Sequence, residues 1–192
     1  MLEKLSRNVS NYFIRMSILN NEDAEICTYG LQIILSSIIS ILLVLFVSIC
    51  RRDIVPGCFY LASYCSTRAF SGGYHASSHF KCISLFVLSY ILMANLQELC
   101  PVKCVPFILI ICVGITILFS PEDSLNNPIS NKSKKSMKKK AVINILILLF
   151  ASLLFIIVRE EKIAKFIALG AAMCDILVIL NVLSKYKRRK YL

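Results

Sequence analysis

The stretch LQIILSSIISILLVLFVSIC, which runs from Leu31 to Cys50, contains no charged residue. A helix of roughly 20 residues is about 30 Å long, the thickness of the hydrocarbon core of a bilayer. Four further apolar runs follow it along the chain: Ile83–Leu99, Val105–Phe119, Ala141–Val158 and Ile163–Leu183. The first two of these are shorter, but they can still cross a bilayer with snorkelling ends. The pattern predicts an all-α, polytopic membrane protein with five spans.

A sixth run, Ile54–Thr67, is weaker because it has only 14 residues and contains Pro56 and Gly57 near its start. A segment of this kind can cross the bilayer, re-enter it or lie along its surface. The sequence therefore predicts five to six hydrophobic helices, and we expect residues 1–192 to form a single integral-membrane domain.

The charge of the chain is as unusual as its apolar content. A net charge of +11 accompanies 57% hydrophobic residues and a mean hydropathy of +0.73. This hydrophobicity excludes a disordered chain. It also argues against a nucleic-acid-binding domain, because the basic residues would share the surface with more apolar area than one small core can hide. We expect a lipid bilayer and no nucleic acid as partner, and we expect the basic residues to mark membrane topology.

Half of the 22 basic residues lie in two clusters. The first cluster is Lys132, Lys134, Lys135, Lys138, Lys139 and Lys140, and the second is Lys185, Lys187, Arg188, Arg189 and Lys190. Two predicted spans separate the clusters, so both can face the cytoplasm, as the positive-inside rule requires. Counting back along the chain places residues 68–82 on the same side. We expect residues 131–140 to form a flexible basic linker in the cytoplasm.

The side of the N-terminus depends on the sixth run. If Ile54–Thr67 crosses the membrane, the N-terminus is cytoplasmic, and Arg51 and Arg52 become an exception on the outside. If the run re-enters instead, the two arginines lie inside and the N-terminus lies outside. We favour the cytoplasmic N-terminus.

Residues 1–27 form an amphipathic segment. Its apolar residues recur at helical spacing, with charged and polar residues on the opposite face. The apolar set is Leu2, Leu5, Val9, Tyr12, Phe13, Met16 and Leu19, and the polar set is Lys4, Arg7, Asn8 and Arg15. Two interpretations are equally well supported. The segment is either a helix that lies in the bilayer interface or holds a partner helix, or a cytoplasmic cap packed on its own protein.

The segment Arg68–Cys82 contains the residues suited to catalysis. It reads RAFSGGYHASSHFKC and holds both histidines of the chain, His75 and His79, within seven residues of Cys82. Nucleophilic cysteine catalysis needs a thiolate, a base that generates it and donors for the oxyanion. The two serines before His79 are good N-cap residues, and a helix that begins there places Cys82 on its second turn. Geometry alone then favours His79 as the base, because it lies three residues before Cys82.

Two other interpretations of this cluster remain open. In one, the histidines belong to a polar loop and Cys82 packs in a helix. In the other, His75, His79 and Cys82 stand at i, i+4 and i+7 on one helix face and form a His₂Cys zinc set. Zinc is disfavoured because no glutamate follows His75 as the zincin pattern requires, and no fourth ligand is evident nearby. We expect no metal and no cofactor.

Asp175 lies near the middle of the last apolar run. A carboxylate at that depth costs up to about 3.5 kcal/mol on insertion scales unless it finds a partner or water. Three roles are open: the side chain can orient His75 as the third member of a triad, pair with an arginine, or face a wet crevice. The last two together are favoured.

The segment Arg68–Cys82 resembles the signature of the accessory gene regulator B (AgrB-like) family. Members of this family are membrane endopeptidases that process the precursors of autoinducing peptides in Gram-positive quorum sensing. The matching elements are Arg68, Gly72-Gly73, His75-Ala76 and Cys82. The stretch PEDSLNNP, Pro121–Pro128, also resembles the family's loop after its middle spans. The resemblance implies that Cys82 is the nucleophile and that His75, not His79, is the base. It also implies supporting roles for Arg68 and Gly73.

The resemblance further implies a reaction and its partners. Family members cleave the C-terminal tail of a short precursor and close a thiolactone or lactone ring through an acyl-enzyme on the cysteine. Such a precursor has an amphipathic head, an internal Cys or Ser and an acidic tail, and the enzyme is a homodimer in the cell membrane. The alternative class is a non-enzymatic membrane component, such as an exporter subunit or an adaptor.

Overall fold

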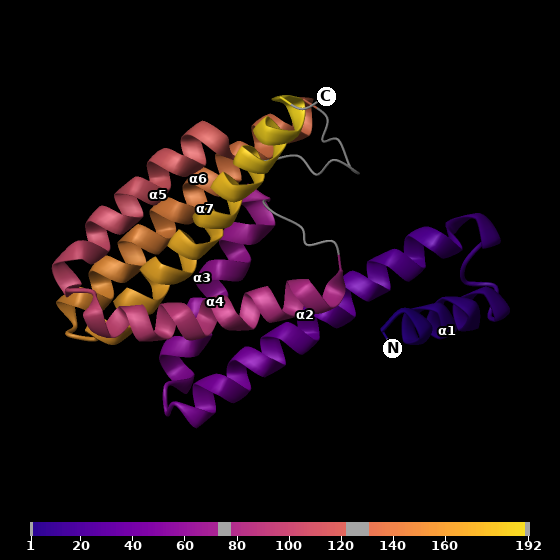
Figure 1. The fold of residues 1–192 in the computed structure, drawn as a ribbon, viewed down its shortest axis with the longest axis horizontal. Coiled ribbons are helices and arrows are strands. Elements are labelled where there is room, and N and C mark those ends of the chain that lie inside the picture. The colour runs from indigo at the N-terminus through magenta and orange to yellow at the C-terminus, as the bar shows by residue number, and fades with distance from the viewer. Residues whose placement is uncertain (1, 73–77, 122–130, 191–192) are drawn as a thin grey trace.

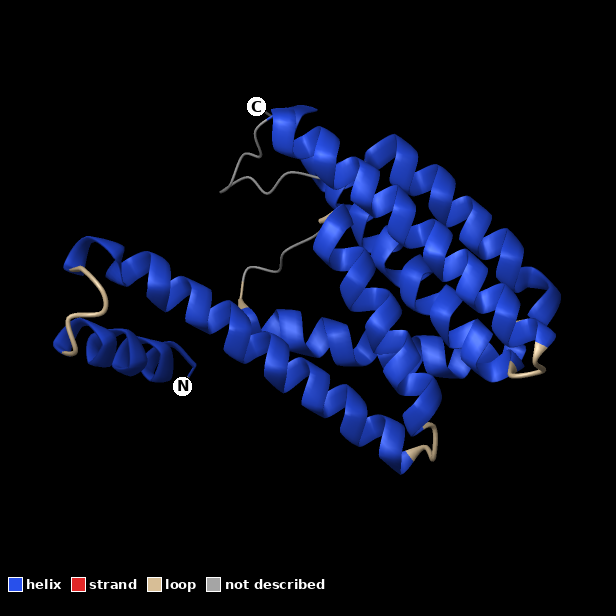
Figure 2. Ribbon diagram, turned by 180° about the vertical axis from the view of Figure 1, so that it is seen from behind, coloured by secondary structure: helices blue, strands red, loops and turns tan. Residues whose placement is uncertain are grey.

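The computed structural model describes residues 2–72, 78–121 and 131–190. Within these ranges the chain is almost entirely helical (Figures 1 and 2). The elements in order are α1 (Leu2–Arg15), η1 (Asn21–Asp23), α2 (Ala24–Cys50), α3 (Ile54–Ser71), α4 (His79–Leu99), η2 (Val102–Cys104), α5 (Val105–Phe119), α6 (Asn131–Ile157) and α7 (Glu161–Lys190). The expected all-α membrane fold is confirmed, because five helical segments are long and apolar enough to cross a bilayer. These segments are Ala24–Cys50, Phe80–Leu99, Val102–Phe119, Ser133–Ile157 and Glu161–Tyr186.

The sixth apolar run forms α3, which is not among those five segments. Its 18 residues correspond to about 27 Å of helix. α3 packs against α7 and α6 and runs between the same two ends of the bundle as they do (Figure 1). Ile54–Thr67 is therefore part of one continuous helix within the bundle, and its crossing of the bilayer stays a prediction.

α7 is the most buried of the five candidate spans and lies against α3. Its buried small residues include Ala164, Ala168 and Ala171. At Gly170 the two backbones approach so closely that a Cβ would lie 2.8 Å from the carbonyl oxygen of Tyr60. One turn away, the Ser63 hydroxyl donates a 2.7 Å hydrogen bond to the carbonyl oxygen of Ile167. Small residues and interhelical hydrogen bonds of this kind are what hold helices together in a bilayer.

Aromatic rings join α3 to α4. Tyr60 meets Tyr90 edge-on with ring centroids 5.1 Å apart, and Tyr64 meets Phe86 in the same way at 4.7 Å. Tyr60 also packs edge-on against Phe166 of α7 at 6.5 Å. A pair of this geometry adds about 0.5–1.5 kcal/mol beyond the area that it buries. The two tyrosines are one turn apart on α3 and their partners are one turn apart on α4, so the contacts form successive rungs between the helices.

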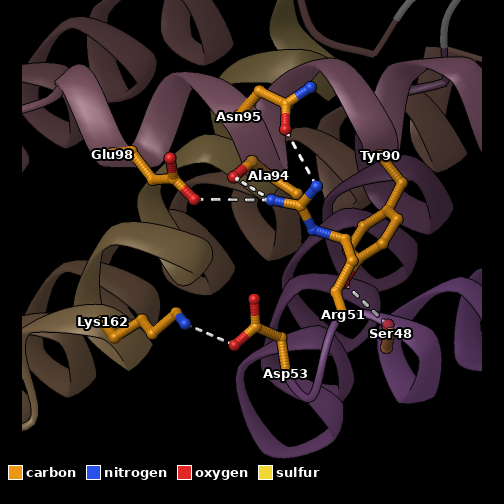
Figure 3. Close-up of polar contacts among 8 residues, drawn as sticks. All are labelled: Ser48, Arg51, Asp53, Tyr90, Ala94, Asn95, Glu98 and Lys162. Carbon is orange, nitrogen blue, oxygen red and sulfur yellow. Dashed lines mark hydrogen bonds and ion pairs between the residues drawn. The ribbon is translucent and has the colours of Figure 1, made fainter.

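Charged groups bind the turn between α2 and α3 to the rest of the protein (Figure 3). Arg51 donates a 2.9 Å hydrogen bond to the side chain of Asn95, and its guanidinium lies 3.6 Å from the carboxylate of Glu98. Asp53, which is buried, pairs with Lys162 near the start of α7. The turn is thus held by the end of α4 and the beginning of α7. If Ile54–Thr67 crosses the membrane, Arg51 is an exception to the positive-inside rule. Its charge is then paired with the carboxylate of Glu98 within the protein.

Residues 131–140 differ from the flexible linker that the sequence indicated, because they form the first turns of α6. Lysine is a good helix former, and the apolar run that follows supplies a helix onto which these residues are added without a new nucleation step. The start of α6 and the end of α7 lie at the same end of the molecule as the end of α3 (Figure 1). The two basic clusters therefore share one end, and its cytoplasmic location stays a prediction.

Gly170→Ala should destabilise the protein by about 1–3 kcal/mol, because the new Cβ must push α3 away from α7. The obstructing atom is a backbone carbonyl oxygen, which cannot rotate aside as the tip of a side chain can. Thermal unfolding of the detergent-solubilised protein, followed with a thiol-reactive dye, measures the loss as a lower midpoint. Gly114→Ala on α5 is the control, since nothing lies within 4 Å of its Cβ position. Equal midpoints for the two variants would contradict the close contact.

Candidate functional site

Cys82 lies at the start of α4. Ser78 caps this helix: its Oγ accepts a 3.3 Å hydrogen bond from the backbone N–H of Lys81, and the N–H of Cys82 donates to the Ser78 carbonyl at 3.1 Å. The helix start expected from the serine pair is confirmed. The Cys82 thiol is exposed, and it lies close to the helix N-terminus, which carries a partial positive charge.

α3 ends at Ser71, and Gly72, four residues after Arg68, is its C-cap. The Arg68 guanidinium donates a 2.9 Å hydrogen bond to the Gly72 carbonyl, and the Gly72 N–H donates to the Arg68 carbonyl at 3.2 Å. Gly72 has φ 72° and ψ −142°, a conformation that residues with a Cβ rarely adopt. The sequence indicated the pair Gly72-Gly73 and gave the supporting role to Gly73, whereas the positive φ that the structure describes is at Gly72.

Three of the predicted site groups fall outside the described residues. Gly73 and His75 belong to residues 73–77, and the side chain of His79 is likewise not described. The choice between His75 and His79 as the base therefore stays a prediction, and so does the rejection of zinc. What the structure places are the residues that flank this segment, Arg68 and Cys82.

Tyr64 connects these two flanking residues. It lies one turn before Arg68 on α3, and its ring packs against Phe86, which lies one turn after Cys82 on α4. Tyr64 is also close enough to interact electrostatically with both the Arg68 guanidinium and the Cys82 thiol. The helix faces that carry Arg68 and Cys82 therefore converge on one buried ring. Tyr64 was not among the residues predicted from the sequence, although the four-residue spacing of Tyr60, Tyr64 and Arg68 indicates a shared helix face.

Asp175 is 1% exposed and faces α5. The groups that interact with its side chain are the thiol of Cys112 and the hydroxyl of Thr116. Neither carboxylate oxygen meets hydrogen-bond geometry with a partner in the described ranges. The preceding residue, Cys174, lies instead near Arg68. α7 thus presents Cys174 towards the Arg68 end of α3 and Asp175 towards α5. The predicted relation of Asp175 to His75 involves a residue that is not described.

Comparison with known proteins gives a family match along most of the chain. A sequence model of the accessory gene regulator B family matches residues 6–180, which include the whole of the candidate site. The chain belongs to the accessory gene regulator B family. Relatives from Clostridium perfringens strains SM101 and 13, provisionally named AgrB-like proteins, are each 29% identical over 167 residues, 82% of this chain and 78% of theirs.

A third relative in this family, from Clostridium beijerinckii and with the same provisional name, is 26% identical over 154 residues. The match covers 78% of this chain and 77% of the relative. No solved structure gives a match. Membership in the accessory gene regulator B family supports involvement of this membrane protein in agr quorum sensing.

Four residues of the candidate site are described. Cys82 lies at the start of α4, Arg68 and the C-cap Gly72 lie at the end of α3, and the ring of Tyr64 on α3 packs against α4. The other stretch that resembles the family, Pro121–Pro128, falls outside the described residues except for its first proline.

Tyr64→Ala should destabilise the protein by about 3–5 kcal/mol, because it removes a buried ring and leaves a cavity between α3 and α4. Tyr64→Phe keeps the edge contact with Phe86 and should unfold close to the wild-type midpoint. The rate at which iodoacetamide alkylates Cys82, read by mass spectrometry, provides a local measurement. We expect this rate to change in the alanine variant, since the start of α4 loses its support. An equal loss of stability in both variants would show that the hydroxyl, not the ring, holds the helices.

Proposed function

We propose that this protein is a membrane cysteine endopeptidase that cleaves the C-terminal tail of a short autoinducing-peptide precursor and promotes ring closure. The observation that carries the proposal is the exposed Cys82 thiol at the capped start of α4, beside the Arg68 end of α3. Membership in the accessory gene regulator B family supports the proposal independently. Cys82 is the nucleophile, and His75 is the general base.

The first step forms an acyl-enzyme. His75 takes the proton of the Cys82 thiol, and the sulfur attacks the carbonyl carbon of the scissile peptide bond. The C–N bond then breaks, and the proton passes from His75 to the amino group of the departing tail. The head of the precursor remains attached to Cys82 as a thioester.

The second step closes the ring. A thiol or hydroxyl inside the precursor loses its proton and attacks the thioester carbonyl, and the sulfur of Cys82 leaves and recovers a proton. The product is a thiolactone when the attacking residue is Cys and a lactone when it is Ser. Exchange of one thioester for another is nearly isoenergetic, so the acyl group stays activated. A site at the membrane boundary limits the competing attack by water.

Arg68 and the basic helix ends suit an anionic substrate. Arg68 fixes the carbonyl of Gly72, and it thereby positions the beginning of the segment that carries His75. Its guanidinium also attracts carboxylates or stabilises an oxyanion. Lysines at the start of α6, among them Lys135, Lys138 and Lys139, are exposed and complement an acidic precursor tail. We propose that the enzyme acts as a homodimer in the cell membrane, with this end in the cytoplasm.

Cys82→Ala and His75→Ala should each lower precursor cleavage by about 10³-fold or more, because each removes a member of the catalytic pair. His79→Ala should retain cleavage. The measurement is mass spectrometry of a co-expressed precursor, which distinguishes the uncut chain, the released tail and the cyclic product.

Cys104→Ala is the matched control, since Cys104 is another exposed, free cysteine, adjacent to the start of α5. Cleavage that survives Cys82→Ala would exclude every mechanism in which a cysteine at this position is the nucleophile. Loss of cleavage in His79→Ala with retention in His75→Ala would reverse the assignment of the base.

Asp175→Asn should leave the cleavage rate unchanged, because the carboxyl group faces Cys112 and Thr116 of α5 and an amide of the same shape keeps that packing. Single-turnover cleavage by the purified protein in nanodiscs measures the rate apart from expression level. A large fall in the rate at unchanged precursor affinity and thermal stability would restore the triad role of Asp175.

A further inference from the structure

α1 packs on α2 with its small polar residues and not with its apolar stripe. Ser6 and Ser10 are fully buried against α2, and the Ser10 hydroxyl donates a 3.2 Å hydrogen bond to the carbonyl of Ala24 in the first turn of α2. Serine on a helix contact lets two backbones approach closely. Among the described side chains of α1, the fully buried ones are therefore these two serines, and Leu5, Tyr12 and Met16 do not take part in the interface.

Those apolar side chains form a stripe that points away from α2. Leu5, Tyr12 and Met16 are 49%, 54% and 55% exposed, and their spacing of seven and four residues places them on one helix face. α1 has 14 residues, about 21 Å of helix, which is too short to cross a bilayer. The stripe is thus an unpartnered face of a helix that does not span the membrane.

Basic residues border this stripe. Lys4 and Arg15 are exposed, and each directly precedes a stripe residue, about 100° around the helix from it. Arg7 lies further round and pairs with Glu3 at 3.0 Å. A helix with an apolar stripe beside a basic one is the arrangement of helices that insert shallowly between anionic lipid headgroups.

The position of α1 agrees with this arrangement. Because Ser10 contacts the first turn of α2, α1 lies beside the residues that directly precede the uncharged run Leu31–Cys50. α1 lies alongside α2, apart from the bundle that α3, α5, α6 and α7 form (Figures 1 and 2). Basic residues next to a long uncharged run lie at the level of the lipid headgroups.

We propose that the Leu5–Tyr12–Met16 stripe of α1 inserts into the headgroup and upper acyl region of an anionic bilayer, and that Lys4 and Arg15 contact the lipid headgroups. A second copy of the chain is the less suitable occupant. Three side chains fall well short of the roughly 800 Å² per partner of a stable interface. A two-fold contact through this face would also bring the basic residues of the two copies together.

Tyr12→Trp tests the proposal directly, because the chain contains no tryptophan. The full-length variant is reconstituted into vesicles of phosphatidylcholine and phosphatidylglycerol, with and without bromine on the upper acyl carbons. Bromine quenches tryptophan only on contact. We expect blue-shifted emission that loses most of its intensity in the brominated vesicles. Met16→Trp provides a second position on the stripe should Tyr12→Trp fail to reconstitute.

Asn11→Trp is the matched control, since Asn11 is exposed but lies about 100° from Tyr12 on the polar side of α1. It should show unshifted emission with little quenching. Equal, weak quenching at positions 11 and 12 would overturn the proposal. Emission from Tyr12→Trp that is blue-shifted, insensitive to bromine and dependent on protein density would assign the stripe to a second copy instead. Lys4→Gln with Arg15→Gln should reduce the quenching of Tyr12→Trp, and unchanged quenching would exclude the headgroup contacts.

Discussion

The backbone contact between α3 and α7 at Gly170 is the constraint on which the position of the site depends. Lipid is as apolar as the helices, so association inside a bilayer rests on close packing and on hydrogen bonds between helices. Gly170 provides the first and the bond from Ser63 to Ile167 provides the second. α3 needs both more than its neighbours do, because it lies outside the set of candidate spans and gains less from lipid by itself.

The position of α3 in turn determines where Cys82 lies. The rings of Tyr60 and Tyr64 contact α4 at two successive turns, so a displacement of α3 also displaces α4. At the opposite end of α3, Asp53 is bound to α7 through Lys162. α3 is therefore held at its start by charge and along its length by packing. The last turn of α3, which carries Arg68, therefore lies beside the start of α4 because of these side-chain contacts.

The spans were predictable from the sequence because a backbone in lipid must satisfy its own hydrogen bonds, so apolar length almost dictates a helix. The start of α4 was predictable because the N-cap at Ser78 is a local interaction. Tyr64 was not, since its importance comes from contacts with another helix. The glycine pair at 72 and 73 was predictable as a turn, but the sequence does not show which of two adjacent glycines adopts a positive φ. The first turns of α6 were misjudged because a lysine run reads as a solvated linker, although lysine readily extends a helix that already exists.

The charged residues at the two ends of the bundle are arranged differently, and the difference bears on the proposed binding of an anionic precursor. Around the turn between α2 and α3, Arg51 and Asp53 contact groups of opposite charge within the protein, which shortens the range of their fields. At the other end, lysines such as Lys138 and Lys139 are directed into solvent. Their summed potential acts over about 8–10 Å at physiological ionic strength. This potential would attract an anionic segment, such as the acidic tail of the proposed precursor, to the basic end of the bundle.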